Sequence, residues 1–485
     1  IGYGFLFQIL LFKNSNELNF GYLGILGFFT IILISSISSF FLAHNFLHNI
    51  ILHLFGVSLF LSNIFKYKQE SLKEIKGLLI VFFIFLISVY VFKNHDDFPY
   101  YHLTYALNLS ENKLMIGSGL FGHGFRTSSS IFQYHSILYM PYIKYYLFHS
   151  GPFLIFVYFN YIILSKLIYK YKKNEFDIVY FFSLLNFIFV NVAFYRLSEH
   201  GTDRSAQILL FLAVITFFEI IFIEKNKNKK IILFNFLLIV IFLAASMKVL
   251  FIIYTLLLPI VYFKDSFFRY YLIKKNIGII MIVGLSFSLS LTTNFFNTGC
   301  LIYPETKTCF FEKFEWSLPE KEVKRMKIHY EWWAKAGGGP GYSSEIKPKE
   351  YVKNFVWFKD WIDRHFFNKV SDTLFGIIFI AFINVIAFWG PKKEKKYKRN
   401  TLLINSVLLL FFLEWFLKHP SMRYGGYVLF ALPIFIYTSK KLETFKPSKK
   451  RILISTTLIV LLTISIFSGR NISRLKQEIV SYNYD

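Results

Sequence analysis

Long apolar runs alternate with short polar stretches along most of the 485-residue chain. A transmembrane helix needs about 20 consecutive apolar residues, somewhat fewer when flanking side chains reach the interface. The runs predict spanning helices over 20–42, 45–65, 77–93, 152–169, 177–194, 205–223, 277–293, 372–390, 401–417, 426–439 and 452–468. The run from Ile231 to Phe263 is too long for one span and is interrupted from Ala244 to Lys248, so it predicts two short helices. With a partial span over 1–12, we predict an all-α, polytopic bundle of about 12 to 14 transmembrane helices.

Lys and Arg are concentrated in six of the polar stretches. These are Lys66 to Lys76, Lys166 to Lys173, Lys225 to Lys230, Arg269 to Lys275, Lys392 to Arg399 and Lys440 to Arg451. With the predicted spans, all six fall on one side of the bilayer, which the positive-inside rule assigns to the cytoplasm. The opposite side receives two long loops, 94–151 and 294–371, and two short ones, 195–204 and 418–425. Because long loops in a compact protein are usually functional, we expect the site on this outer side.

Composition agrees with a membrane protein and removes one alternative. Hydrophobic residues make up 55% of the chain, and the mean hydropathy is +0.47. A net charge of +25 would suggest nucleic-acid binding in a soluble protein, but here orientation in the bilayer explains the clustered Lys and Arg. The two cysteines, Cys300 and Cys309, exclude a disulfide framework and leave a single bridge open.

The first long loop opens with the candidate reactive residues. Asp96 and Asp97 follow a span directly, and His102 comes five residues later. Adjacent carboxylates at a membrane surface offer a general base, a metal ligand, or both. The alternative is an ordinary helix N-cap, since Asp precedes Pro99 in a first helical turn.

A glycine-rich stretch follows in the same loop. Its glycines allow close backbone approach, and Arg126 with the hydroxyls of 127–130 is suited to binding an anion. The alternative is a turn that precedes a serine-capped surface helix.

Three further positions carry charge beside or within apolar runs. Asp203 belongs to a short charged loop with Glu199, His200, Thr202 and Arg204, which indicates paired interfacial charges more than a metal site. Lys248 lies inside an apolar run and needs a partner or cavity there, unless the chain turns and leaves it at the outer surface. Arg423 is suited to hold a phosphate, with pairing to Glu414 or to an outer-loop carboxylate as the alternative.

Together these positions resemble the GT-C superfamily of membrane glycosyltransferases, and in particular a bacterial inner-membrane branch of GT-C-like proteins. The matching residues are Asp97, Tyr101 and His102; Gly119, Leu120, His123, Gly124, Arg126, Ser128 and Ser129; Gly299, Tyr303, Pro304, Trp316 and Pro319; and Pro420 and Arg423. They extend over roughly residues 90 to 430. Two departures are the second aspartate before Asp97 and the additional spans before Lys76.

The resemblance implies four regions in the chain. These are N-terminal transmembrane helices over 1–76, a GT-C-like core over 77–293 with the catalytic outer loop 94–151, a second periplasmic loop over 294–371, and C-terminal transmembrane helices over 372–485.

The resemblance also implies inverting transfer of a sugar from a polyprenyl-phosphate-linked donor to a cell-envelope glycan, lipid or protein acceptor. Asp97 would be the general base, helped by Asp96, with His102 or His123 orienting the acceptor. Arg126, Lys248 and Arg423 would neutralise the leaving phosphate, and Tyr101 and Tyr303 would contact substrate. A divalent cation, Mg or Mn, is left open, with Asp96 and Asp97 as its ligands.

Two other functional classes remain as alternatives. An O-antigen polymerase or ligase-like protein also has many spans and a large outer loop, but relies more on arginines. A lipid or solute transporter usually places charges at mid-membrane in paired halves, whereas here they collect at one face and no repeat is seen. A catalytic interpretation predicts that Asp97, Arg126, Lys248 and Arg423 lie around one cavity.

Overall fold

The chain folds as a bundle of helices. The computed structural model describes residues 1–12, 18–66, 68–91, 97–197, 201–264, 276–339, 341–392 and 401–482. Among these residues the strands are β1 (Gly338–Gly339) and β2 (Tyr342–Ser343), which pair antiparallel with Gly338 opposite Ser343. The predicted all-α class is confirmed.

Eight helical segments of the described residues are long and apolar enough to cross a membrane. They are α2 (Phe20–Ser39), α3 (Phe46–Lys66), α9 (Ser150–Lys173), α11 (Gly201–Phe222), α12 (Lys227–Met247), α15 (Ile277–Thr298), the continuous segment Phe358–Phe388 and α22 (Lys449–Tyr482). The segment Phe358–Phe388 joins α18 (Phe358–Trp361), the π-helix η6 (Ile362–Val370) and α19 (Ser371–Phe388). The chain is therefore an integral membrane protein.

The other predicted spans correspond to shorter or more polar helices. These are α1 (Gly2–Leu11), α4 (Lys68–Phe85) with α5 (Ile87–Tyr90), α10 (Ile178–Ala193), α20 (Leu402–Lys418) and α21 (Gly426–Leu442). The predicted break before Lys248 is present, because α12 ends at Met247 and a 3-10 helix, η4 (Val249–Leu256), leads into α13 (Leu257–Lys264). Among the described residues, eight helical segments have the length and hydropathy of a membrane span. This is fewer than the 12 to 14 predicted, because the remaining predicted spans are shorter or more polar helices.

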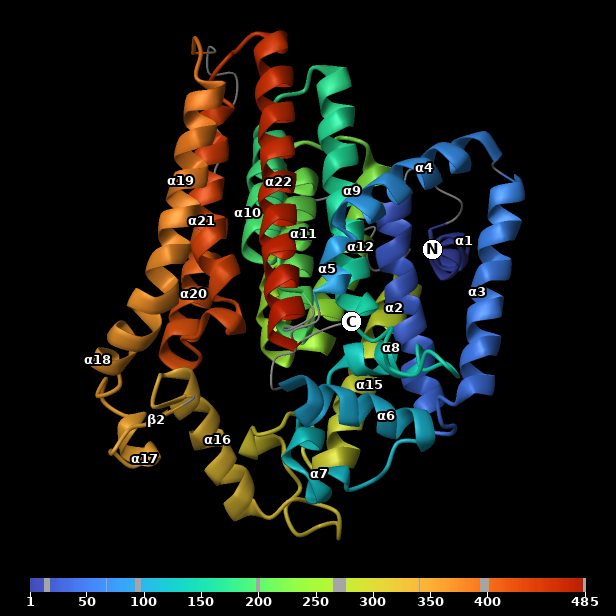
Figure 1. Ribbon diagram of the computed structural model, residues 1–485, viewed down its shortest axis with the longest axis vertical. Helices are drawn as coiled ribbons and strands as arrows, with labels where there is room; N and C mark the ends of the chain where they lie inside the picture. Colours follow the sequence, from blue (N-terminus) through green and yellow to red (C-terminus); the bar gives the residue numbers. More distant parts are fainter. Residues whose placement is uncertain are drawn as a thin grey trace.

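Burial separates central from peripheral helices. In the most apolar stretches of α2, α11 and α12, 83% of the residues are buried, whereas the share is 11% in α3 and 22% in α15 and α22. Helices α11 and α12 pack against each other along the centre of the bundle (Figure 1). Their all-round apolar surface is typical of helices surrounded by protein, and the exposed apolar side chains of α3, α15 and α22 suit contact with lipid.

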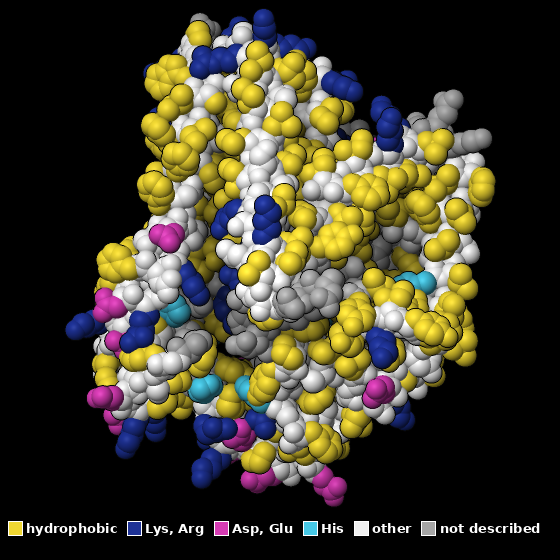
Figure 2. Space-filling model, viewed as in Figure 1, with side chains coloured by type: hydrophobic (Ala, Val, Ile, Leu, Met, Phe, Trp, Pro, Cys, Tyr) yellow, Lys and Arg dark blue, Asp and Glu magenta, His cyan; other side chains and the backbone are white. Residues whose placement is uncertain are grey.

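The two ends of the bundle differ in content. At one end, which we call the loop end, lie the elements of the two long loops: η1 (Phe98–His102), α6 (Leu103–Glu111), α7 (Ser118–Phe121), η2 (His123–Arg126), α8 (Ser130–Ser136), η5 (Thr306–Thr308), α16 (Glu320–Ala334) and α17 (Pro348–Tyr351). The opposite end, the basic end, carries the turns that join α9 to α10 and α21 to α22 (Figure 1). Figure 2 shows Lys and Arg side chains at both ends of the bundle, whereas in that view Asp and Glu side chains lie toward the loop end and not at the top, over the basic end. Two of the predicted basic stretches, 269–275 and most of 392–399, lie outside the described residues.

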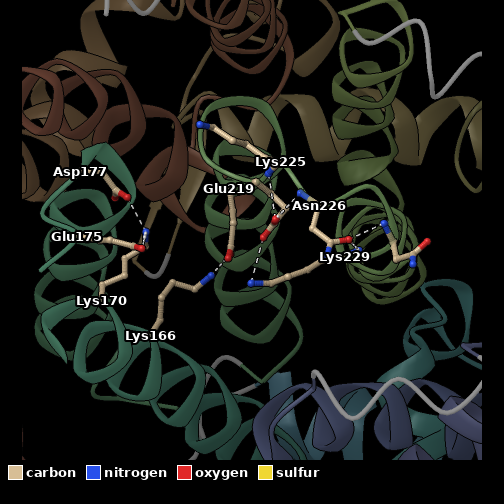
Figure 3. Close-up of polar contacts among 10 residues, drawn as sticks. Lys166, Lys170, Glu175, Asp177, Glu219, Lys225, Asn226 and Lys229 are labelled. Carbon is tan, nitrogen blue, oxygen red and sulfur yellow. Dashed lines mark hydrogen bonds and ion pairs between the residues drawn. The ribbon is translucent and has the colours of Figure 1, made fainter. Parts of the chain in front are cut away.

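Three lysines near the basic end are paired with carboxylates. Lys166 of α9 pairs with Glu219 of α11, with side-chain exposures of 7% and 11% (Figure 3). Nearby, Lys170 Nζ lies 2.6 Å from Asp177, and Lys229 Nζ lies 3.1 Å from Glu224. Burying a lysine in a membrane protein is tolerated when a carboxylate faces it, so these pairs have a structural explanation.

Candidate functional site

Asp97 precedes η1 at the N-cap position but does not act as a cap. Its side chain accepts no hydrogen bond from the first turn, and instead its Oδ2 accepts a hydrogen bond of 2.6 Å from Arg423 Nη2. The carboxylate is 24% exposed. The capping alternative is therefore excluded for Asp97, while Asp96 lies outside the described residues.

Asp203 is a second carboxylate of the site, held in the first turn of α11. Its side chain is 1% exposed, and its Oδ2 accepts a hydrogen bond of 2.7 Å from Arg423 Nε. Its Oδ1 pairs with Lys248 Nζ. An aspartate buried this deeply is stable as an anion because two cations face it.

Lys248 reaches this position because α12 stops directly before it. Its backbone is extended, with φ −148° and ψ 106°, so the side chain leaves the helix axis beside Asp203. Ser129 Oγ donates to Met247 O at 2.8 Å, and Ser130 Oγ lies 2.7 Å from Ser246 Oγ. The first long loop thus fixes the end of α12. The two alternatives for Lys248 both hold in part, because the chain turns there and a carboxylate also faces the ammonium group.

Arg423 enters from the short 3-10 helix η7 (Met422–Tyr424), between α20 and α21. Gly425 follows with φ +106°, a left-handed conformation that side chains disfavour, and it allows the chain to turn sharply into α21. Gln207 Nε2 of α11 donates to Arg423 O at 3.2 Å, which fixes the turn against the bundle. The expected partner Glu414 instead lies 3.6 Å from His419 Nε2.

These contacts link four charged side chains from four segments in one chain: Asp97, Arg423, Asp203 and Lys248, which we call the loop-end cluster. Two positive and two negative charges give it no net charge. Lys248 Nζ also lies 4.3 Å from the centre of the Tyr424 ring, a cation–π contact.

Tyr101 and His102 lie beside this cluster. Their rings pack edge to face at 4.3 Å between centres. Burial lowers the pKa of His102 to about 4, against smaller opposing effects of Asp97 and Asp203, and burial raises the pKa of the Tyr101 hydroxyl. His102 is therefore neutral at pH 7 and able to donate or accept a hydrogen bond without adding charge.

Arg126, His123 and Tyr303 do not join the loop-end cluster. Arg126 Nη1 lies 2.6 Å from Glu322 Oε1 in α16, and His123 Nε2 lies 3.2 Å from the Tyr330 hydroxyl. Tyr303 is buried in a small core with Cys300, Leu318, Val323 and Met326. The structure thus divides the predicted residues into two groups, one around Asp97 and one around Arg126.

The serines after Arg126 have structural partners. Ser128 Oγ donates to Asn294 Oδ1 of α15, and Ser129 and Ser130 contact the end of α12. Their hydroxyls therefore fix the loop to two spanning helices, and the expectation that they bind an anion together with Arg126 stays a prediction. Cys300 and Cys309 form a disulfide in the second long loop.

Two residues gain importance that the sequence did not give them. Asp203 was assigned to paired interfacial charges, and its actual partners, Lys248 and Arg423, are 45 and 220 residues away. Glu322 carried no signal beyond its place in the second loop. The available clue for Asp203 was its position in a short charged run directly before a long apolar run.

In the loop-end cluster the described candidate metal ligands are Asp97 and Asp203, while the predicted ligand Asp96 lies outside the described residues. Among the described residues no three His, Cys, Asp or Glu side chains gather closely enough to hold an ion. Asp97 and Asp203 are already bonded to the guanidinium of Arg423. The cluster instead combines a partly exposed carboxylate with two cations at the membrane boundary, which suits proton transfer beside an anionic group.

A family model described as "Domain of unknown function (DUF8201)" matches residues 1–430, so the chain belongs to this family. No curated protein and no solved structure matches the chain.

Proposed function

We propose that this protein is a GT-C-type membrane glycosyltransferase, which transfers a sugar from a polyprenyl-phosphate-linked donor to an acceptor hydroxyl at the loop end of the bundle. The observation that carries the proposal is the pairing of Asp97 with Arg423, in a cluster that also contains Asp203 and Lys248. This arrangement agrees with the resemblance of the sequence motifs to that superfamily.

The orientation follows from charge. In Figure 2 the basic end shows Lys and Arg side chains without Asp or Glu, whereas the loop end shows charges of both signs. The positive-inside rule assigns the purely basic end to the cytoplasm. The Cys300–Cys309 disulfide at the loop end suits an oxidising compartment. We therefore place the protein in a bacterial inner membrane with its loop end in the periplasm, where an envelope glycan, lipid or protein serves as acceptor.

Asp97 is the better of the two carboxylates for the base. It is 24% exposed, whereas Asp203 is 1% exposed and bonded to both Lys248 and Arg423. In the proposed step Asp97 takes the proton of the acceptor hydroxyl while the oxygen of that hydroxyl attacks the anomeric carbon. The bond from that carbon to the phosphate oxygen breaks, the electron pair leaves with the phosphate, and the anomeric configuration inverts.

Lys248 and Arg423 are positioned to stabilise the leaving phosphate. Without donor, both cations are neutralised by aspartates. A donor phosphate would compete with Asp97 for Arg423, and the carboxylate it releases becomes available as the base. Asp203 acts as a positioning residue that keeps both cations at the boundary.

Transfer by the purified full-length protein in detergent tests the proposal. Polyprenyl-phosphate sugars serve as donors, and formation of a glycosidic bond is measured. We expect product from the wild type and from Asp177→Asn, a control at the basic end, and none from Asp97→Asn. Product retained in Asp97→Asn but lost in Arg423→Ala would favour an O-antigen polymerase or ligase-like activity. Solute or lipid movement across vesicles without any glycosidic bond would favour a transporter.

A further inference from the structure

A cavity of about 360 Å³ lies between the two long loops, apart from the loop-end cluster. It is lined by His123, Arg126, Glu322, Arg325, Met326 and His329. The first two belong to η2 of the first loop, and the other four to α16 of the second. Because both loops supply walls, the cavity exists only while they are docked.

The second loop has its own support at this place. Met326 belongs to the small buried core that contains Cys300 and Tyr303, and the disulfide closes the same stretch of chain. On the other side, Arg126 Nε donates to Gly119 O at 2.8 Å. The cavity walls are therefore held by packing and covalent links as well as by charge.

Two guanidinium groups in the cavity converge on one carboxylate. Arg126 Nη1 lies 2.6 Å from Glu322 Oε1, while Arg325 donates to Oε1 at 2.8 Å and to Oε2 at 2.9 Å. Hydrogen bonds from Arg325, together with those from Arg126 and against the effect of burial, lower the pKa of Glu322 to about 2. Paired guanidinium groups match the planar oxygens of a carboxylate or the oxygens of a phosphate.

Two histidines add neutral polar groups to the same cavity. Burial is the main cause that lowers the pKa of His123 and of His329, so both imidazoles are neutral at pH 7. His123 Nε2 contacts the Tyr330 hydroxyl, and its buried Nδ1 has no hydrogen-bond partner among the described residues. Such a nitrogen is available to a hydroxyl group of a ligand.

We propose that this cavity binds an oxyanion, the carboxylate or phosphate group of a glycan, and that Glu322 occupies the place of that anion until the glycan binds. The ligand oxyanion would take the hydrogen bonds that Arg126 and Arg325 now give to Glu322. Sugar hydroxyls would then face His123 and His329. The cavity would carry one net positive charge with Glu322 in place and two once its carboxylate is displaced, which favours an anionic ligand.

The position of the cavity fits a second contact for the same substrate. Tyr330 contacts His123, and Gly124 of η2 packs closely against Tyr101, next to the loop-end cluster. The identity of the ligand as a glycan rests on the proposed function, whereas binding of the anion does not require transfer.

Equilibrium binding to the full-length protein in detergent tests this inference, with inorganic phosphate and glucuronate as separate probes. We expect Glu322→Gln to lower the Kd of at least one probe about tenfold, because it removes the internal competitor. Adding Arg126→Gln to that variant should abolish the gain. Glu320→Gln is the matched control, since this glutamate is on the same helix, pairs with Lys324 and does not line the cavity.

The probes separate the two sources of the anion. Tighter binding of phosphate alone identifies a phosphate-bearing ligand, and tighter binding of glucuronate alone identifies a sugar acid; both support the inference. No saturable binding of either probe to Glu322→Gln overturns it, provided the variant melts like the wild type. If Glu322→Gln does not fold, Arg325→Gln should still weaken binding relative to the wild type, and unchanged binding overturns the inference. Intact binding without any sugar transfer would overturn the proposed function alone.

Discussion

Helices α11 and α12 carry charged residues at both ends, and the two sets are paired differently. On α11, Asp203 lies at the loop end and Glu219 at the basic end; sixteen residues at 1.5 Å each separate them by about 24 Å. On α12, Lys229 lies near the basic end, and Lys248 directly follows the last turn at the loop end. The same two helices therefore place charge at both membrane boundaries.

At the basic end, Lys166 and Glu219 satisfy each other and are shielded from solvent. At the loop end, one arginine is shared by two aspartates, and Asp97 and Arg423 are each about a quarter exposed. The buried pair of Lys166 and Glu219 has a structural role in packing, whereas Arg423, which is shared and accessible, can exchange one carboxylate for a ligand. Accessibility and unequal sharing, more than charge alone, distinguish a candidate site from a structural pair.

Replacing both residues of an ion pair with apolar residues should give the largest difference in sugar transfer between the basic end and the loop end. Lys166→Met with Glu219→Leu should leave sugar transfer unchanged, since a buried pair can be exchanged for apolar residues of similar volume. If the proposed function holds, Asp203→Leu with Lys248→Met should lower transfer about a thousandfold, or about 4 kcal/mol, because the cation proposed to stabilise the leaving phosphate is lost. Transfer rates of the two purified double variants measure this. Full transfer by the second variant would make the loop-end cluster structural, like the pair at the basic end.

Removing one partner at the basic end should cost stability instead. Glu219→Leu leaves Lys166 without its carboxylate inside the bundle, and we expect a loss of about 3 kcal/mol in the free energy of unfolding. Thermal and chemical unfolding in detergent measure the loss. Glu175→Ala, which removes a half-exposed partner of Lys170, should cost under about 1 kcal/mol. Equal effects of the two substitutions would contradict the comparison.

The loop end should also be the more sensitive to acid. His102 has a folded-state pKa of about 4, below the ordinary value of 6.5, so the folded protein binds fewer protons than the unfolded chain. The contribution of neutral His102 to the free energy of unfolding is complete above pH 6.5. It declines as the pH falls toward 4, and the loss is about 2 kcal/mol at pH 5. Melting temperatures at pH 7.5 and pH 5 should therefore differ less in His102→Gln than in the wild type. An identical pH response would mean that His102 is not buried as a neutral group.

The smallest expected effect concerns the support of Lys248. Ser129→Ala removes the hydrogen bond to Met247 O at the end of α12, which should cost about 1 kcal/mol and lower transfer several-fold. Ser58→Ala is the control, because this exposed hydroxyl bonds only within its own helix. Unfolding and transfer measurements on both variants decide whether the loop positions the cluster; equal results would show that it does not.

Apolar length predicts much of this fold, because each spanning helix must cover the hydrocarbon core. The break before Lys248 was predictable for the same reason, since a lysine interrupts an apolar run. The pairing of Asp97 with Arg423 was not, because spacing along the chain gives no distance between segments 326 residues apart. Whether Asp97 caps a helix or bonds elsewhere depends on side-chain direction, which the sequence leaves open. Arg126 was expected beside Lys248, but Glu322, 196 residues later, determines its position.

The four segments of the loop-end cluster also set an order of assembly. Synthesis proceeds from the N-terminus, so Asp203 and Lys248 can pair while the rest of the chain is still being made. Asp97 receives its arginine only after the late hairpin of α20 and α21 has entered the membrane. A nascent chain that has not yet inserted this hairpin lacks a complete cluster, and insertion of η7 is the step of biogenesis that completes the site.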